Sequence, residues 1–259
     1  MRPLQESQDT GDPYWTRSAL WKQPLEGMKG QPVSRLLTRL VLLARRKYVL
    51  DIDGEEYIGN DRDPFILVAN HSQYAEAIVM GALLAFLRRG KRVRFLADWN
   101  FALIPPVAML YHCAHCILLD QKPPKPRFLG VFKPLFVGDV AGFERAKLAL
   151  ADGDCVGVFP EGTTNRDPHR LLKGHSGAAR LSLETGATVI PAGIRYPGYT
   201  GVRRIGERAA AQVRFGAPMK PGSPMDKPAL GDVRQWHQEL MGAIAQLSGK
   251  SQSTMRRHH

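Results

Sequence analysis

The sequence predicts a three-layer α/β domain with a mixed, largely parallel central sheet flanked by helices, plus an amphipathic helix near the N-terminus. Continuous apolar runs, such as Phe-Ile-Leu-Val-Ala over residues 65–69, are typical of strands buried on both faces of a sheet. Segments with apolar residues at helical spacing alternate with these runs. The chain of 259 residues, 44% hydrophobic and 23% charged, has the composition of a globular protein with one sizeable core.

The N-terminal segments differ from each other in character. Residues 1–30 are polar, with Pro, Gly and scattered charges, and we expect a poorly ordered leader there with one helical turn near residues 15–21. Residues 31–47 instead carry basic residues and apolar residues at helical spacing. The apolar positions are Val33, Leu36, Leu37, Leu40, Val41 and Leu43. This pattern predicts an amphipathic basic helix that either anchors the protein in a membrane interface or packs on the core with a solvated charged face.

The domain that we expect over residues 48–247 alternates strands with helices. In its first half we predict a strand pair over 48–58 with a turn at Asp53-Gly54, a strand over 65–69, a helix over 72–89 capped by Ser72, a strand over 93–97, a short or broken helix over 101–111 and a strand over 116–119. In its second half we predict helices over 139–151, 176–184 and 232–247, and strands over 156–159, 188–190 and 212–215. Residues 248–259 are polar and basic, and we expect a disordered tail.

The net charge of +12 restricts the partners that the protein can attract. A strongly positive chain favours nucleic acids, anionic membrane faces, or phosphorylated substrates and carriers, although the charge also serves solubility alone. We expect no nucleic-acid partner, because the basic residues are dispersed and no zinc-finger, helix-turn-helix or RNA-recognition signature occurs. No secretory signal and no run of about eighteen apolar residues is present, so we expect a peripheral association with the cytoplasmic face of a membrane.

The cysteines indicate a reducing compartment. Their number is three, which is odd and argues against a disulfide framework. Residues 112–116, His-Cys-Ala-His-Cys, have the Cys-x-x-Cys spacing of zinc sites. No second cysteine pair accompanies them, since Cys155 stands alone in an apolar stretch. We therefore predict no metal site and no cofactor.

Two short stretches carry the chemistry. In residues 70–76, Asn-His-Ser-Gln-Tyr-Ala-Glu, an imidazole stands five residues ahead of a carboxylate. Histidine is a base near neutral pH, and a nearby carboxylate can fix its tautomer and stabilise the charged ring. Residues 158–163, Val-Phe-Pro-Glu-Gly-Thr, form an apolar run broken as at the exit of a buried strand. The backbone N–H groups and the hydroxyl of such a turn can bind an anion.

Together these stretches resemble the glycerolipid acyltransferase family, the PlsC-like domain, whose signatures are His-x4-Asp and Phe-Pro-Glu-Gly-Thr in that order. Residues 116–120 are similar to the family's apolar strand that ends in Asp-Arg, and residues 189–194 to its late strand around a proline. The resemblance covers roughly residues 60–220. It implies a three-layer α/β fold and acyl transfer without a covalent enzyme intermediate, with His71 as the base and Glu76 as its orienting partner.

The resemblance also implies a binding site for the acceptor. Its expected residues are Asn70, Glu161, Gly162, Thr163, Arg166 and Lys173. The glycine-threonine turn would bind the head group, and the two basic residues would hold a phosphate. Four positions depart from the family pattern: Glu76 replaces Asp, Gln121 replaces the Arg after Asp120, and Thr164-Asn165 replaces a frequent Arg-Ser. The missing arginines leave acceptors other than lysophosphatidic acid open.

We therefore expect an acyltransferase that moves a fatty acyl chain from acyl-coenzyme A or acyl carrier protein to the hydroxyl of a lysolipid in phospholipid biosynthesis, first of all 1-acyl-sn-glycerol 3-phosphate. The alternatives are another lysophospholipid or lyso-aminolipid, and a family member made inactive by Glu76. A serine hydrolase is a further alternative, since Ser176 lies in a near Gly-x-Ser-x-Gly pattern that Ala178 interrupts. A non-catalytic anion- or membrane-binding module is the last, with His71 as a loop residue and Glu76 complementing a helix dipole.

Overall fold

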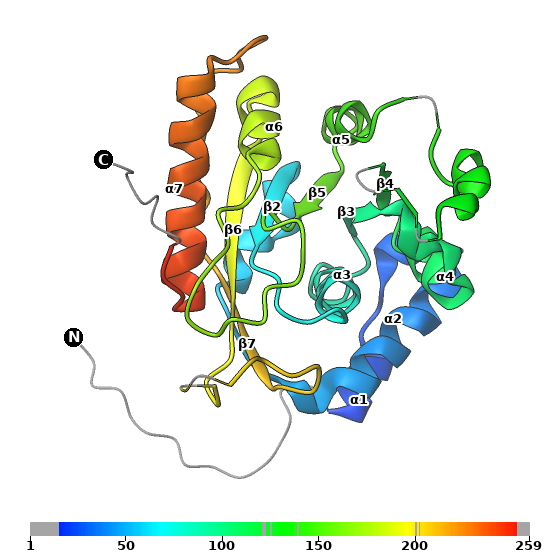
Figure 1. The fold of residues 1–259 in the computed structure, drawn as a ribbon. Helices are drawn as coiled ribbons and strands as arrows, with labels where there is room; N and C mark the ends of the chain where they lie inside the picture. The colour runs from blue at the N-terminus through cyan, green and yellow to red at the C-terminus, as the bar shows by residue number, and fades with distance from the viewer. Residues whose placement is uncertain are drawn as a thin grey trace.

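Seven strands in the described part of the chain form one central sheet (Figure 1). The computed structural model describes residues 16–120, 123–124, 126–138, 140–199, 201 and 203–252. The strands are β1 Val49–Asp53, β2 Phe65–Ala69, β3 Val93–Asp98, β4 Ile117–Leu119, β5 Cys155–Val158, β6 Thr188–Arg195 and β7 Ala211–Phe215. Their order is β1-β7-β6-β2-β5-β3-β4, and every neighbouring pair is parallel except β6 with β7. This arrangement confirms the predicted mixed, largely parallel sheet.

Helices cover both faces of the sheet and complete the predicted three layers (Figure 1). The α-helices are α1 Arg17–Lys22, α2 Pro32–Arg45, α3 Glu76–Leu87, α4 Pro105–Cys113, α5 Gly142–Ala151, α6 Gly177–Thr185 and α7 Leu230–Ser248. The 3₁₀ helices are η1 Glu26–Met28, η2 Arg46–Tyr48, η3 Glu55–Ile58, η4 Asn60–Arg62, η5 Trp99–Leu103 and η6 Arg127–Leu135. One core cluster joins the sheet to α1, α2 and α3, and the other joins it to α5, α6 and α7.

Strand β2 lies at the centre of the sheet, and helices cover it on both faces. Its sequence is therefore apolar at every position instead of alternating. Phe65, Leu67 and Ala69 pack in the cluster under α1 to α3, whereas Ile66 and Val68 pack in the cluster under α5 to α7. All five side chains are fully buried. Burying an aliphatic or aromatic side chain of this size contributes roughly 1.5–3 kcal/mol. The strand predicted over 65–69 is therefore confirmed, and its end fixes the position of the residues that follow.

The N-terminal segment is ordered from residue 16 onward. Leu20 of α1, together with Leu25 and Met28 beyond it, is buried in the core beside α2 and α3. The expected poorly ordered leader is thus wrong for residues 16–30, because these apolar side chains supply part of the core. Residues 1–15 lie outside the described residues.

Helix α2 confirms the predicted helix, but its buried face is the more polar one. Ser34 and Thr38 are buried with Leu42, while Leu36 and Leu40 are 46% and 43% exposed. The Thr38 hydroxyl donates to the Ser34 carbonyl within the helix at 2.9 Å, so its burial leaves no unpaired donor. This face of α2 is turned towards α3, and Ser34 and Thr38 line a cavity between the two helices. Among the described residues, no helix is long and apolar enough to cross a membrane.

Two local expectations in the first half are wrong. Residues 48–58 contain one strand, β1 (Val49–Asp53), which is followed by η3 instead of a second strand. The strand β1 pairs in parallel with β7, about 160 residues later, which a local pattern does not reveal. Ser72 is not a helix cap, because α3 begins at Glu76 and Ala75 occupies the cap position without a side-chain bond. The residues between β2 and α3 instead form the turn that carries the site.

The C-terminal end of the fold is longer than expected. Helix α7 extends to Ser248, and Gly249 then reverses the chain with a φ of +71°. Lys250 is only 4% exposed, and Ser251 pairs with Arg170 in a parallel bridge. A disordered tail from residue 248 is therefore wrong for residues 248–252. Residues 253–259 lie outside the described residues.

Candidate active site

The two motif stretches meet at the carboxyl edge of the sheet. Strands β2 and β5 are parallel neighbours, with Leu67 opposite Gly157, so both chains leave the sheet at the same edge. The rings of His71 and Phe159 stack with their centroids 4.5 Å apart. Both rings line a cleft of about 320 Å³ with mostly apolar walls. Two segments that lie about ninety residues apart in the sequence thus form one site.

The imidazole of His71 pairs with the carboxylate of Glu76 across the start of α3. Nδ1 of His71 lies 2.8 Å from Oε2 of Glu76. The Glu76 side chain is 6% exposed, and the His71 side chain is 14% exposed. Among the described residues none hydrogen-bonds Nε2, the other ring nitrogen, and the ring lines the cleft. The two side chains therefore lie close together, as expected. Nε2 of His71 is left for a ligand.

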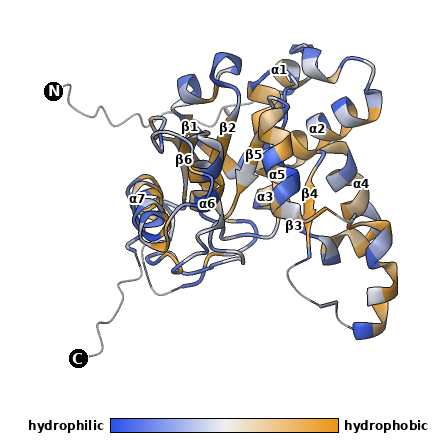
Figure 2. Cartoon of the chain, turned by 90° about the horizontal axis from the view of Figure 1, so that it is seen from above, coloured by the Kyte–Doolittle hydropathy of each residue, from blue (hydrophilic) through white to orange (hydrophobic). Residues whose placement is uncertain are grey.

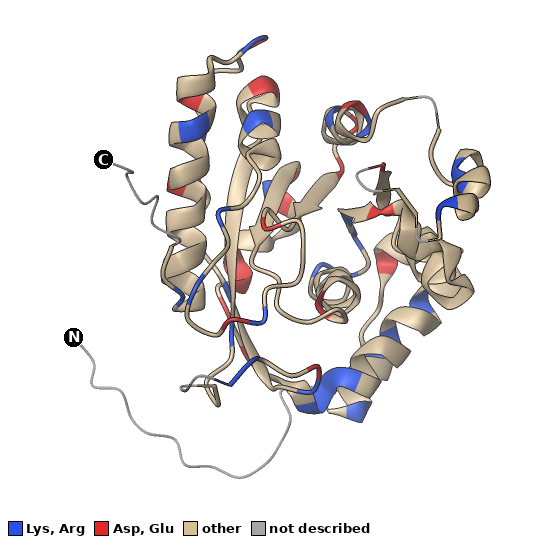
Figure 3. Ribbon diagram, in the orientation of Figure 1, with Lys and Arg blue, Asp and Glu red and all other residues tan. Residues whose placement is uncertain are grey.

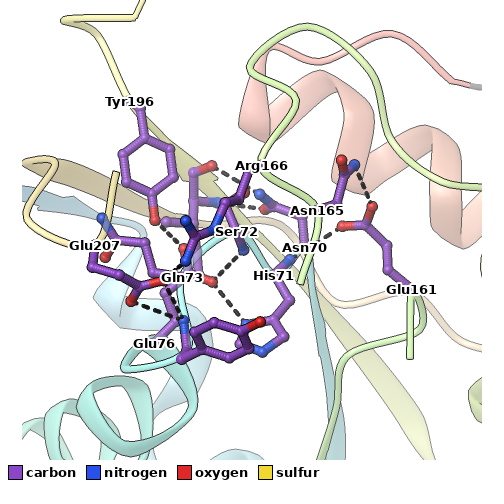
Figure 4. A network of polar contacts seen from close by, with 12 residues as sticks. Asn70, His71, Ser72, Gln73, Glu76, Glu161, Asn165, Arg166, Tyr196 and Glu207 are labelled. Carbon is purple, nitrogen blue, oxygen red and sulfur yellow. Dashed lines mark hydrogen bonds and ion pairs between the residues drawn. The ribbon is translucent and has the colours of Figure 1, made fainter. Parts of the chain in front are cut away.

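Glu76 has a partner for each oxygen (Figure 4). Oε2 also accepts a hydrogen bond from the backbone N–H of Ser72 at 2.5 Å. Oε1 accepts a hydrogen bond from the hydroxyl of Tyr196, which follows β6. Burial, and then the charge of Glu76, raise the pKa of Tyr196 well above its ordinary value, so this hydroxyl stays a donor. Such a carboxylate holds the proton of the imidazole on Nδ1 and leaves the lone pair of Nε2 facing the cleft.

Glu161 holds the main chain of His71 and does not face the cleft. Its Oε1 accepts from the His71 backbone N–H at 3.1 Å, and its Oε2 accepts from the Asn165 side chain at 2.7 Å and the Leu172 backbone at 2.8 Å. The residue is 3% exposed. The backbone N–H of Asn165 donates in turn to the carbonyl of His71 at 2.7 Å. The expectation that Glu161 contacts the acceptor is therefore corrected, because protein donors occupy both of its oxygens.

Asn70 is also turned away from the cleft. Its side chain is fully buried and bonds both backbone groups of Ile194 in β6, the N–H at 2.7 Å and the carbonyl at 2.9 Å. The residue extends the β2–β6 ladder by one rung beyond the strand. Its expected role in substrate binding is corrected to a role in fixing the loop that begins with His71.

Gly162 and Thr163 line the cleft as expected, together with Thr164. Gly162 has a φ of +64°, and a Cβ there would lie 2.7 Å from the ring of His175. Glycine is therefore required both by the backbone and by the close approach of that ring. His175 itself lines the cleft. It is a site residue that the motifs did not reveal, since only the turn geometry brings it beside Gly162.

The two predicted phosphate-binding residues do not line the cleft. Arg166 forms an ion pair with Glu207, and its guanidinium lies 5.4 Å from the ring centroid of Tyr74, a residue of the cleft wall. Arg166 thus lies at the rim (Figure 4). Lys173 is exposed, and its backbone carbonyl accepts from Nε2 of His237 at 3.0 Å. The structure brings neither cation to the imidazole.

The arrangement does not match the serine hydrolase alternative. Ser176 precedes α6 and follows a loop over residues 171–175 with no strand leading into it. A nucleophile elbow requires a strand directly before the serine. Among the described residues, no group of three or more His, Cys, Asp or Glu side chains is placed to hold a metal ion.

The site is thus a largely buried histidine–carboxylate pair beside an apolar cleft, at the carboxyl edge of an α/β sheet. The model of the family described as Acyltransferase matches residues 49–195, more than half of the chain, and the chain belongs to that family. The fold is similar to the crystal structure of the 1-acyl-sn-glycerophosphate (LPA) acyltransferase, PlsC, from Thermotoga maritima. The TM-score is 0.56 with 20% sequence identity over 82% of this chain and 78% of that chain. No curated protein sequence matches. The suspected PlsC-like family is thereby confirmed.

Proposed function

We propose that this chain is an O-acyltransferase that moves a fatty acyl chain from acyl-coenzyme A or acyl carrier protein to the hydroxyl of a lysolipid. The first candidate acceptor is 1-acyl-sn-glycerol 3-phosphate. One observation carries the proposal: the pair formed by His71 and Glu76 presents Nε2 to the cleft while Nδ1 is occupied. This is the arrangement that a general base needs to deprotonate an alcohol.

The reaction follows from that geometry in one sequence of bond changes. The acceptor hydroxyl gives its proton to Nε2 of His71 as its oxygen attacks the thioester carbonyl carbon, and a new C–O bond forms. The C–S bond then breaks, and the departing sulfur takes the proton from Nε2. Glu76 stabilises the imidazolium between the two steps, with its charge held in place by Ser72 and Tyr196. General base catalysis of this kind contributes roughly 10²- to 10⁴-fold to a rate.

An apolar cavity next to the cleft supports a fatty acyl substrate. It lies between α2, α3, α4 and β3, and its walls are mostly apolar, with Ser34, Thr38 and Arg92 as polar exceptions. The cavity and the cleft share four wall residues, Ala77, Leu96, Ala97 and Tyr111. The shared walls place this cavity of about 60 Å³ beside the cleft that His71 lines, and we propose it as the place where the alkyl chain of the donor begins to be buried. Each methylene that leaves water there gains about 0.8 kcal/mol.

The charged residues near the cleft support a second class of acceptor, one with an amino head group. Arg166 is neutralised by Glu207 at the rim, while Asp98 is one of the residues that line the cleft. Oδ1 of Asp98 accepts hydrogen bonds from Asn100, and in the part of the chain that the structure describes Oδ2 is the oxygen left for a cationic group. An anionic head group would have to displace Glu207 from Arg166. An acceptor with an amino head group would instead meet Asp98 directly. A lyso-aminolipid is thus the second candidate acceptor.

We also propose that the protein works on the cytoplasmic face of a membrane as a peripheral protein. The outward face of α2 exposes Val33, Leu36 and Leu40, and α4 exposes Met109 in the same region of the fold. Hydrophobic stretches appear on both helices in Figure 2, and basic residues, all of them arginines, lie along α2 in Figure 3. A basic helix with an outward apolar face suits an interface with anionic lipids.

A transfer assay tests the proposed function. Radiolabelled acyl-coenzyme A and acyl carrier protein are offered with a panel of lysolipids that includes lysophosphatidic acid, lysophosphatidylethanolamine and a lyso-aminolipid. We expect transfer to at least one acceptor by the wild-type chain and a loss of roughly 10²- to 10⁴-fold in His71→Ala. His112→Ala, which removes an exposed histidine on α4, is the matched control. Transfer that survives in His71→Ala would contradict the proposal.

A further inference from the structure

A lysine from the C-terminal end of the described chain lies behind the active site. Lys250 is 4% exposed and follows α7 by two residues. Burial of an ammonium group is costly, and lysine is almost never fully buried without partners. Its position therefore requires specific contacts. Those contacts lie on the two loops that form the site.

Lys250 joins the two motif loops. Its Nζ donates to the hydroxyl of Ser72, next to the base, at 2.8 Å, and to the carbonyl of Asn165, in the turn after Thr163, at 3.5 Å. Ser72 and Asn165 are both buried. These two residues already bond the catalytic pair, because Ser72 donates to Glu76 and Asn165 donates to the carbonyl of His71. The ammonium group thus contacts two residues that bond His71 and Glu76, and Lys250 is not among the residues that line the cleft.

The charge of Lys250 also matches its surroundings. Burial lowers the pKa of its ammonium group, whereas nearby carboxylates, first Glu161 and then Glu76, act in the opposite direction. These are the two buried carboxylates that hold the main chain and the ring of His71. A buried cation near two buried anions reduces the penalty of keeping both of them charged.

The backbone around Lys250 directs the side chain inward. Gly249 has a φ of +71° and ends α7 with a left-handed turn. The next residues run beside the loop that follows Asn165: Ser251 donates to the carbonyl of His169 at 2.7 Å, and Leu171 donates to the carbonyl of Ser251 at 2.9 Å. Lys250 is therefore fixed on both sides, which is unlike a lysine of a solvated tail.

We propose that Lys250 is a positioning residue of the transfer site, which holds Ser72 and Asn165 together and thereby fixes the imidazole of His71 relative to the cleft. The inference rests on the proposed role of His71 as the base. It adds to the active site a chain segment that neither motif contains.

Steady-state kinetics of Lys250→Met test this role. Methionine has a similar length, but it leaves the buried carboxylates Glu161 and Glu76 without the cation, which is destabilising. Circular dichroism therefore first checks that the variant is folded. We expect kcat to fall roughly ten- to a hundredfold with KM changed by less than about threefold, because small misplacements of catalytic groups act on the chemical step. Lys250→Arg, which keeps the charge and donors, should recover part of kcat. Lys227→Met, at an exposed lysine before α7, is the matched control. A wild-type kcat in Lys250→Met would overturn the inference.

A second readout is independent of turnover. The Nδ1–H proton of His71, hydrogen-bonded to Glu76, gives a downfield NMR signal that His71→Ala identifies by its loss. We expect this signal to shift or broaden in Lys250→Met and, as a second variant with Lys250 intact, in Ser72→Ala. An unchanged signal in both variants would overturn the inference. This result does not depend on finding a donor and an acceptor that the protein uses. A wild-type chain without transfer activity would instead count against the proposed function alone.

Discussion

The hydroxyl of Tyr196 donates to the oxygen of Glu76 that does not face His71. The phenol is 6% exposed, and 120 residues separate it from the carboxylate in the sequence. This contact fixes the rotation of the carboxylate about its last bond. The orientation of the imidazole therefore depends on a side chain that directly follows the C-terminal end of β6.

Removing this hydroxyl should affect both stability and catalysis. For Tyr196→Phe we expect the free energy of unfolding to fall by about 1.5–3 kcal/mol, as for other hydrogen bonds to charged groups. We expect kcat to fall roughly tenfold because Glu76 becomes free to rotate. Urea denaturation and initial rates measure the two effects. Tyr199→Phe, whose ring contacts Tyr196 edge-on at 6.4 Å, is the matched control. Equal kcat values for both variants would contradict the assigned contact.

Glu161→Gln should weaken the site although Glu161 does not line the cleft. An amide NH₂ in this position would face one of the three N–H donors that the carboxylate accepts. We expect a loss of about 1–3 kcal/mol in the free energy of unfolding, since a buried group is left without its partner. We also expect a lower kcat, because the backbone of His71 is released. Glu239→Gln, at an exposed glutamate on α7, serves for comparison. A fully stable Glu161→Gln variant would refute the arrangement.

The outward face of α2 should determine binding to anionic vesicles. Burial of a leucine in the interface contributes up to roughly 1.5–3 kcal/mol, so Leu36→Glu combined with Leu40→Glu should weaken binding at least about tenfold. Sedimentation with phosphatidylglycerol vesicles measures the effect, and circular dichroism checks the fold. Leu148→Glu combined with Leu230→Glu changes two leucines that are more exposed than Leu36 and Leu40 but lie on α5 and α7. If both pairs reduce binding equally, α2 is not the docking face.

Alkaline pH should destabilise the fold through its buried thiols. Burial raises the pKa of Cys155 from an ordinary value of 9.0 to about 12, and burial likewise raises that of Cys116 to about 12. Between these values the unfolded chain has lost the proton and the folded chain keeps it. The unfolded state therefore binds fewer protons, and the free energy of unfolding falls with rising pH, by about 1.4 kcal/mol per pH unit for each thiol.

Cysteine substitutions isolate this effect. In Cys155→Ala we expect the slope between about pH 9.5 and 11 to be shallower by roughly 1.4 kcal/mol per pH unit, although the substitution lowers stability at every pH. Urea denaturation at several pH values measures the slope. Parallel pH profiles for the variant and the wild type would show that the buried thiol does not titrate as described.

Much of this fold could be predicted from local patterns, and the reason is visible in β2. A strand that contacts helices on both faces must be apolar at each position, so residues 65–69 are recognisable without neighbours. The proximity of His71 and Glu76 could also be predicted locally. Only five positions separate the two residues, and the short turn between them leads directly into α3, which begins at Glu76. The expected hairpin over 48–58 was wrong because strand pairing is not a local property.

The rest of the site arises from long-range contacts that have no signature in the sequence. Glu161 belongs to a recognisable motif, yet only the folded chain shows that its oxygens bond His71 and Leu172 instead of a ligand. Tyr196 and Lys250 belong to no motif at all. A lysine in a polar, basic segment resembles any solvated lysine until the turn at Gly249 directs it inward.

The hydrogen bonds around His71 and Glu76 have a consequence for how the protein folds. They connect positions that are 90, 120 and 178 residues apart in the sequence. Contacts of such separation form late and slowly during folding, since the intervening chain must first be ordered. Recovery of turnover after dilution from denaturant should therefore lag behind recovery of helix content, and specific activity can serve as the most stringent measure of correctly folded protein in a preparation.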